Sequence, residues 1–236
     1  MYFRHSSEIW RDYPELVPGV LFAEGITTDA SIDSRVATFY AIADSRLADT
    51  SEGDLPEIQA WRRAFSRMGL KPTQYRCASE SLLRRYKRER SLPRIHPLID
   101  LCNAISLAFA IPVAVLDASA IGEHLEVRYA DGDESYLAFS GEIEKPDAHE
   151  VIFMDDARRA HARRWTNRQS RYSAVRDTTT AVLIVAEAMH RSAATEVQRL
   201  TAAIADELNV IWSVTPRTMM LSQSSPRFEF ERRPAP

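Results

Sequence analysis

The chain has 236 residues, 45% of them hydrophobic, which is enough to bury the core of one large domain. Its formal net charge of −3 excludes a polycation, so any binding of nucleic acid must come from a local basic patch and weaken with salt. No apolar stretch approaches the length of a membrane span, and no cationic start leads into an apolar run. Cys77 and Cys102 lack CxxC spacing, so we expect free thiols in a cytoplasmic protein.

The first half of the chain carries mainly helical spacing. Apolar residues predict helices over 8–13, 33–49 and 55–68, with a strand at 20–26 between the first two. Pro56 suits the first turn of the third helix, and Gly69 is placed to end it. Another helix begins at Ser79, and Pro97 opens one that is apolar on most sides up to Phe109.

The spacing changes to that of strands after Ile111. The predicted strands span 112–116, 124–129, 134–139, 150–154 and 179–186. A hairpin turn at 130–133 is expected to join the second and third of them. An amphipathic helix follows at 193–208, and residues 216–236 are polar and rich in Pro and Arg, which predicts a disordered tail. Helices first, strands in the middle and one helix last favour an α+β fold.

The strongest functional signal is the stretch HARRWTNRQSRYSAVRDTTTAVLIV, residues 161–185. Guanidinium groups beside an aromatic ring and two amides can bind phosphate, stack on a base and read polar groups. If the stretch is one regular strand, Trp165, Asn167 and Gln169 face the same side as Arg163, and Arg168 faces the other. We therefore expect a ligand site here.

This arginine-rich stretch also has a purely structural interpretation. Residues 158–171 hold six arginines with no acid between them, and these could pair with Asp155, Asp156 and Asp177. Three carboxylates cannot neutralise six guanidinium groups, however. Trp165 could equally be a core residue.

Two further features allow either a structural or a functional interpretation. Asn103 lies inside an apolar helix, where a buried amide must either brace the backbone or face a polar ligand. A second basic cluster lies on the helix that begins at Ser79 and comprises Arg84, Arg85, Lys87, Arg88 and Arg90. It is either a solvated face or a patch that binds phosphates.

The usual sequence signatures of catalysis are missing. The chain has no GxSxG elbow, no glycine-rich phosphate loop and no HExxH or paired histidine spacing. We therefore expect no metal and no cofactor, and the catalytic residues stay unknown. An enzyme with this sequence would have to work by positioning water and substrate.

Two stretches resemble a known family. HPLIDLCNAISLAFAIPVAVLD, residues 96–117, is similar to the SPxxVDxxNYxxLxxGQPxHAFD segment of the B3/B4 domain in the beta subunit of bacterial phenylalanyl-tRNA synthetase. ARRWTNRQSRYSAVRDTTTAVLIVAEA, residues 162–188, falls where that domain carries its GIMGG loop. The match is nearer to free-standing B3/B4 proteins, which typically read NxxVDxxNxxSLxxxxPxxxxD and CRRWNWRQS. It covers roughly residues 55–190.

The resemblance implies an α+β B3/B4 fold with a central mixed or antiparallel sheet packed with helices. It divides the chain into an N-terminal extension of the same domain (1–50), the B3/B4-like domain (51–215) and the tail (216–236). In the synthetase this fold hydrolyses the ester bond of tyrosine that is wrongly attached to phenylalanine tRNA. Asn103, Pro112 and Asp117 match residues of the family's first motif. The family's His falls at Ala114 and its tyrosine-reading Glu at Val185, so this chain lacks that acceptor.

The leading hypothesis is editing in trans, in which a positioned water hydrolyses the ester of a mischarged aminoacyl-tRNA. The partner is then the aminoacylated acceptor end of a tRNA. The expected substrate-binding residues are Asn103, Trp165, Asn167, Arg168, Gln169 and Ser170. The expected RNA-binding residues are Arg84, Arg85, Arg88, Arg163 and Arg164. The alternatives are a non-catalytic RNA-binding or small-ligand-binding module on the same fold, and a sensor of free amino acid or nucleotide.

Overall fold

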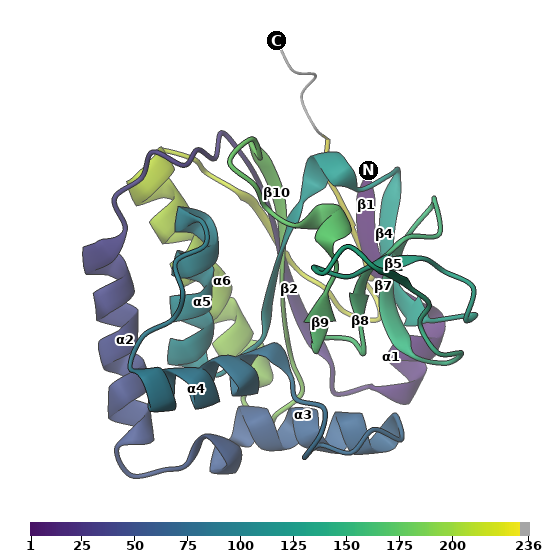
Figure 1. Ribbon diagram of the computed structural model, residues 1–236, viewed down its shortest axis with the longest axis horizontal. Coiled ribbons are helices and arrows are strands. Elements are labelled where there is room, and N and C mark those ends of the chain that lie inside the picture. Colours follow the sequence, from purple (N-terminus) through teal and green to yellow (C-terminus); the bar gives the residue numbers. More distant parts are fainter. Residues whose placement is uncertain (232–236) are drawn as a thin grey trace.

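Two main β-sheets and a layer of helices build the fold (Figure 1). It is a computed structural model that describes residues 1–231, and residues 232–236 lie outside the described part. The antiparallel four-stranded sheet has the order β11 (Arg217–Met220), β2 (Val17–Glu24), β10 (Ala181–Ala188), β3 (Val113–Asp117). The six-stranded sheet has the order β12 (Arg227–Glu229), β1 (Tyr2–His5), β4 (His124–Tyr129), β7 (Val151–Asp155), β8 (Ala160–Arg163), β9 (Arg168–Gln169). β1 and β4 pair in parallel, which makes this sheet mixed.

The described helices fall into two groups, one of which forms an outer layer. The outer layer beside the four-stranded sheet consists of α2 (Asp33–Leu47), α5 (Pro97–Phe109) and α6 (Ala193–Trp212). The other helices are α1 (Ser7–Asp12), α3 (Pro56–Arg67) and α4 (Ala78–Glu89). Short 3-10 turns span Glu52–Asp54, Ala118–Ala120 and Arg171–Ser173, and β5 (Tyr136–Leu137) pairs with β6 (Ile143–Glu144). The α+β architecture expected from the sequence is confirmed, and no helix within residues 1–231 is long and apolar enough to cross a membrane.

Prolines and a glycine set helix boundaries as the sequence predicts. Pro56 and Pro97 occupy the first turns of α3 and α5, where a missing N–H removes no helical hydrogen bond. Gly69, just past the end of α3, has a φ of +75°. This left-handed conformation is the one that favours glycine after a helix.

β10 separates two hydrophobic cores. All of its residues are buried, and successive side chains point to opposite faces of a strand. Val182 and Ile184 pack into the core beneath α2, α5 and α6. Leu183 and Val185 pack into a second core, which the four-stranded sheet shares with the six-stranded sheet, α1 and α3. The alternation of side chains along β10 therefore determines which of its residues can reach a site on the side of the six-stranded sheet.

Two expectations about the strands are wrong. The hairpin at 130–133 does not form, because β4 pairs with β7 and β1 while Tyr136–Leu137 pairs with Ile143–Glu144. Residues 216–231 are not a disordered tail, because β11 extends one sheet and β12 extends the other. Phe228 and Phe230 are buried beside Phe22, which supplies the apolar contact that holds this segment. The remainder of the expected tail, 232–236, lies outside the described residues.

Candidate functional site

The tryptophan–arginine stretch forms a hairpin and not the single strand expected from the sequence. β8 ends at Arg163, β9 begins at Arg168, and the two residues pair across the hairpin. Arg164 and Trp165 in the connecting loop have positive φ angles of 46° and 57°, which turn the chain back. The alternation predicted for a regular strand is therefore wrong within this loop.

Trp165 fastens the hairpin to the core. Its side chain is 1% exposed and meets Tyr13 and Trp61 edge to face, at 4.8 and 5.2 Å between ring centroids. Its Nε1–H donates to both carboxylate oxygens of Glu187, at 3.0 and 3.1 Å. Oε1 of the same carboxylate also lies 2.6 Å from Nε2 of His5. Trp165 is thus a core residue and a wall of the site at once.

A narrow cleft lies between this hairpin and the four-stranded sheet. Its volume is about 70 Å³. The residues that line it are Ala78, Pro112, Val113, Ala114, Leu116, Phe153, Ala162, Trp165, Thr166, Asn167, Arg168, Gln169, Val185 and Glu187. Ala114 and Val185 pair directly across β3 and β10, so the positions matched to the family's His and Glu are neighbours. They give the cleft an apolar wall.

Two amides hold the hairpin in place over the cleft. Nε2 of Gln169 donates to the carbonyl oxygen of Val115 at 2.7 Å, which ties the hairpin to β3. Nδ2 of Asn167 donates to the carbonyl oxygen of Arg76 at 2.8 Å, just before α4. The guanidinium of Arg168 donates to both oxygens of the Glu144 carboxylate at 3.0 Å. These three side chains line the cleft as expected, but each is also part of its frame.

Asn103 and Ser170 do not belong to the cleft. The residues flanking Asn103 on α5 pack with Val182 and Ile184, on the face of β10 opposite to Val185, and none of the cleft's described lining residues comes from α5. The expectation that Asn103 converges with the hairpin is therefore wrong. Ser170 is fully buried, and its hydroxyl donates to the carbonyl oxygen of Leu137 at 2.9 Å. Ser170 does not line the cleft, and the expectation that it binds substrate stays a prediction.

Two polar groups in the cleft were not predicted from the sequence. The hydroxyl of Thr166 is buried and has no hydrogen-bond partner among the described residues. Glu187 places a buried carboxylate on the same face of β10 as Val185. The parity of the strand gives a signal for Glu187, since residues two apart share a face. Nothing in the sequence marks Thr166, because its placement depends on the turn.

The arginines near the hairpin differ in their access to solvent. Arg163 is 4% exposed, and its guanidinium binds the carboxylates of Glu144 and Glu150 at 2.7 to 2.9 Å. The expectation that Arg163 binds RNA stays a prediction, although both carboxylates already neutralise its charge inside the molecule. Arg164 is half-buried, with its guanidinium 4.7 Å from the centroid of the Tyr75 ring. It remains near the surface beside the start of α4.

The basic residues of α4 are exposed and ion-paired. Arg85 and Arg88 both reach Glu89, at 2.8 and 2.5 Å. Arg84 lies 3.4 Å from Glu52. Exposed ion pairs of this kind contribute little to stability and exchange partners readily. The guanidinium groups therefore stay available to phosphates. Because Ala78 lines the cleft, α4 starts at the cleft. From there the helix runs away from the hairpin (Figure 1).

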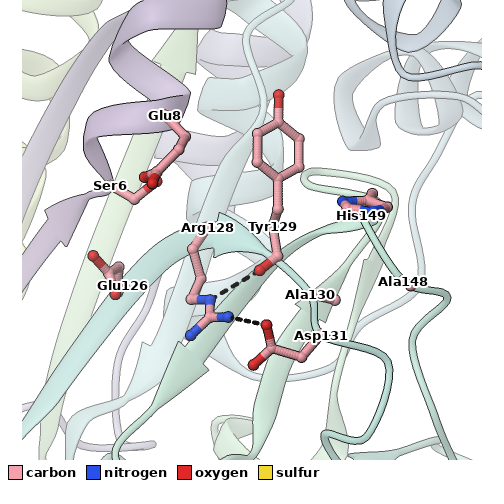
Figure 2. A pocket seen from close by; sticks show the side chains of 9 residues that line it. All are labelled: Ser6, Glu8, Glu126, Arg128, Tyr129, Ala130, Asp131, Ala148 and His149. Atoms are coloured by element: carbon pink, nitrogen blue, oxygen red, sulfur yellow. Dashed lines mark hydrogen bonds and ion pairs between the residues drawn. The ribbon is translucent and has the colours of Figure 1, made fainter.

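A second, larger hollow lies on the outer side of β4. Its volume is about 560 Å³. Figure 2 shows it between the start of α1 and the loops around Ala130 and Ala148. Within it, Arg128 donates to Asp131 at 2.7 Å and to the carbonyl oxygen of Tyr129 at 2.8 Å. Arg128 and Glu126 point away from the core that contains Leu125, Val127 and Trp165. This hollow is therefore separate from the cleft.

Neither cysteine is placed for nucleophilic chemistry. Cys77 and Cys102 are free and buried. Burial raises the pKa of Cys77 to about 11 and that of Cys102 to about 12. Such thiols are almost fully protonated at neutral pH, and only the thiolate is reactive.

The model of the B3/4 domain matches residues 60–207 of the chain. The chain belongs to the B3/4 domain family. The matched range takes in the cleft and α4, and the described strands β1, β2, β11 and β12 lie outside it.

This B3/4 protein resembles part of a solved structure. The N-terminal fragment of the phenylalanyl-tRNA synthetase beta subunit from Pyrococcus horikoshii is 10% identical, with a TM-score of 0.49. The match covers 91% of this chain and 50% of that one, so the B3/4 protein spans half the length of the structure that it matches. No curated protein matches the chain.

Proposed function

We propose that this B3/4 protein hydrolyses the ester bond of a mischarged aminoacyl-tRNA in trans, in the cytoplasm. The observation that carries the proposal is the cleft between the hairpin and β3–β10, which combines an apolar wall with an unpaired buried hydroxyl at Thr166. A narrow cleft of this kind suits an amino-acid side chain held next to a positioned water. The family membership supports the same proposal.

The roles proposed for the side chains follow from their positions. Trp165, Asn167, Arg168 and Gln169 form the wall of the amino-acid pocket. The acceptor end of the tRNA binds the exposed arginines of α4 and the half-buried Arg164, and these are Arg84, Arg85, Arg88 and Arg164. Because α4 begins at the cleft, an RNA strand bound along it would end beside the pocket.

The proposed reaction needs no nucleophilic side chain. A water molecule attacks the carbonyl carbon of the ester, and the bond to the ribose oxygen breaks. The ribose oxygen takes up a proton, which releases the free amino acid and an intact tRNA. The hydroxyl of Thr166 is the group that we place beside this water, because a buried hydroxyl without a partner can both donate and accept a hydrogen bond.

The size of the cleft predicts the amino acid. An apolar cavity of about 150 Å³ accommodates benzene, whereas this cleft has a volume of about 70 Å³. A tyrosine ring would therefore not fit, and the carboxylate that reads its hydroxyl in the family is replaced by Val185. We expect alanyl- and seryl-tRNA to be hydrolysed at least about 10-fold faster than tyrosyl-tRNA. A difference in side-chain size of a few methylenes typically changes the rate in a fitted pocket by this much. Single-turnover hydrolysis of a panel of mischarged tRNAs measures this.

The alternative is a tRNA-binding module without chemistry, which the absence of the family's His and Glu at Ala114 and Val185 favours. Such a module would shift tRNA in a gel with a strong dependence on salt but release no amino acid. A sensor of a free amino acid or nucleotide would show neither the shift nor the hydrolysis. Hydrolysis of every tRNA in the panel at the rate without protein would end the editing proposal.

A further inference from the structure

Three side chains with metal-binding groups meet at one end of β10. Glu57 comes from the first turn of α3, His190 from the turn that follows β10, and Glu196 from the first turn of α6. One possible ligand atom from each residue lies within 4.8 Å of the other two. Nε2 of His190 is 3.1 Å from Oε2 of Glu196, close to the spacing of about 3.3 Å between two ligands of one tetrahedral Zn²⁺.

The cluster is buried and short of positive charge. Glu57 is 3% exposed and His190 is 7% exposed. The guanidinium of Arg46 donates to Oε1 of Glu57 at 2.6 Å, and the hydroxyl of Ser192 donates to Oε1 of Glu196 at 2.9 Å. Oε2 of Glu57 is buried, and no donor from the described chain reaches it.

Without a further binding partner, this arrangement destabilises the folded protein. A buried carboxylate oxygen without a hydrogen bond loses its hydration and gains nothing in return. The carboxylate of Glu196 lies within hydrogen-bonding reach of Glu57. Two carboxylates this close repel each other unless a proton or a cation lies between them. A cation between the two carboxylates and the imidazole would satisfy the free oxygen of Glu57 and remove the repulsion at once.

We propose that Glu57, His190 and Glu196 bind a divalent transition-metal cation, with Zn²⁺ as the best fit. One imidazole nitrogen and two carboxylate oxygens match the ligand preferences of Zn²⁺, while Mg²⁺ and Ca²⁺ prefer sets composed of oxygen alone. The side chain of Glu196 is 26% exposed, which leaves an approach for the ion and for a water as fourth ligand. Arg46 offsets one negative charge, so the affinity is lower than for an unopposed pair of carboxylates.

The ion would fasten the elements behind the cleft. α3, which carries Glu57, also carries Trp61, whose ring contacts Trp165 and whose Nε1–H donates to the backbone oxygen of Glu187 at 3.3 Å. A cation bound by the cluster ties α3 to the junction between β10 and α6. This site is independent of the function proposed above. Spacing along the sequence does not show it, because Glu57 lies far from His190 and Glu196 in the chain.

The test is metal binding by the whole chain after treatment with a chelator. We expect one Zn²⁺ per chain by elemental analysis and a rise in melting temperature as Zn²⁺ is added, since a ligand specific for the native state stabilises it. Cobalt(II) in place of Zn²⁺ should give the visible absorption of a four-coordinate site. Glu57→Gln and His190→Gln should each weaken binding by more than about 100-fold, beyond the loss typical of an outer hydrogen-bond partner.

The chain offers a matched control and a substitute variant. Asp131, Asp133 and Glu134 also lie within reach of one another, but Asp131 and Asp133 are exposed and Arg158 pairs with both. Asp133→Asn should bind Zn²⁺ like the unsubstituted protein. If a buried variant does not fold, Glu196→Gln changes the more exposed ligand and should show the same loss. Uptake that survives all three cluster substitutions, or no uptake by the unsubstituted chain, would overturn the proposal.

Discussion

Trp165→Ala is expected to lower the free energy of unfolding by about 3–5 kcal/mol, the usual cost of removing a large aromatic ring from a core. The side chain is 1% exposed, packs between Tyr13 and Trp61, and donates its N–H to Glu187. Removing the ring creates a cavity and leaves a buried carboxylate with one donor fewer. Urea denaturation followed by circular dichroism measures the change.

Trp212→Ala is the matched control for this prediction. Trp212 ends α6, is only half-buried, and donates its N–H to the carbonyl oxygen of Thr27 at 3.0 Å. We expect it to lose less than half as much stability as Trp165→Ala. Equal losses would show that Trp165 is not the anchor of the hairpin.

Glu187→Ala is expected to cost a similar amount, about 3–5 kcal/mol, as for the loss of one partner from a buried charged network. The Glu187 carboxylate is 2% exposed and accepts from Trp165, with Nε2 of His5 at 2.6 Å. Without it, both rings keep buried polar groups that have no partner. The exposed Glu142→Ala should change stability by no more than about 0.5 kcal/mol.

A double-mutant cycle identifies the cause of the Glu187 effect. If the bond between His5 and Glu187 is responsible, His5→Ala combined with Glu187→Ala should cost less than the sum of the two single substitutions. Contacting residues of this kind show coupling of about 0.5–3 kcal/mol. Strict additivity in urea denaturation would contradict the proposed network.

The helices could be predicted from the sequence, because their signals are local. The spacing of apolar residues and the prolines at the first turns gave 33–49, 55–68 and a helix from Pro97 to Phe109, and the structure has α2, α3 and α5 there. The C-terminal strands were missed for a different reason. In Arg227–Phe230 the phenylalanines alternate with charged residues, which is a strand pattern, but the polar composition of the whole tail outweighed it.

The candidate site was predicted only in part. The sequence identified Trp165, Asn167, Arg168 and Gln169, and the structure places all of them on one cleft. It gave no indication of the turn at Arg164, since positive φ angles in residues other than glycine have no reliable sequence signal. Nor could the sequence show the partners of the arginines, which come from distant acids that the sheet brings close.

Asn103 shows the limit of arguing from a helix that is apolar on most sides. Such a helix has no single buried face, so its sequence does not say which neighbour a given polar residue meets. In the structure α5 packs on the helical side of the four-stranded sheet, and the sheet separates it from the hairpin. Ala114 and Val185, on the other face of that sheet, are the residues that meet the cleft.

The most direct test of the proposed site is to fill the cleft. Ala114 is half-buried on β3 next to Val185, so Ala114→Phe puts a ring into the space proposed for the amino acid. Ala202→Phe, on the exposed side of α6, adds the same ring elsewhere. Both proteins and the unsubstituted chain are compared in single-turnover hydrolysis of seryl- or alanyl-tRNA and in tRNA binding. We expect that Ala114→Phe alone falls to the rate without protein while still binding tRNA. Hydrolysis by Ala114→Phe at the rate of the unsubstituted chain would contradict it.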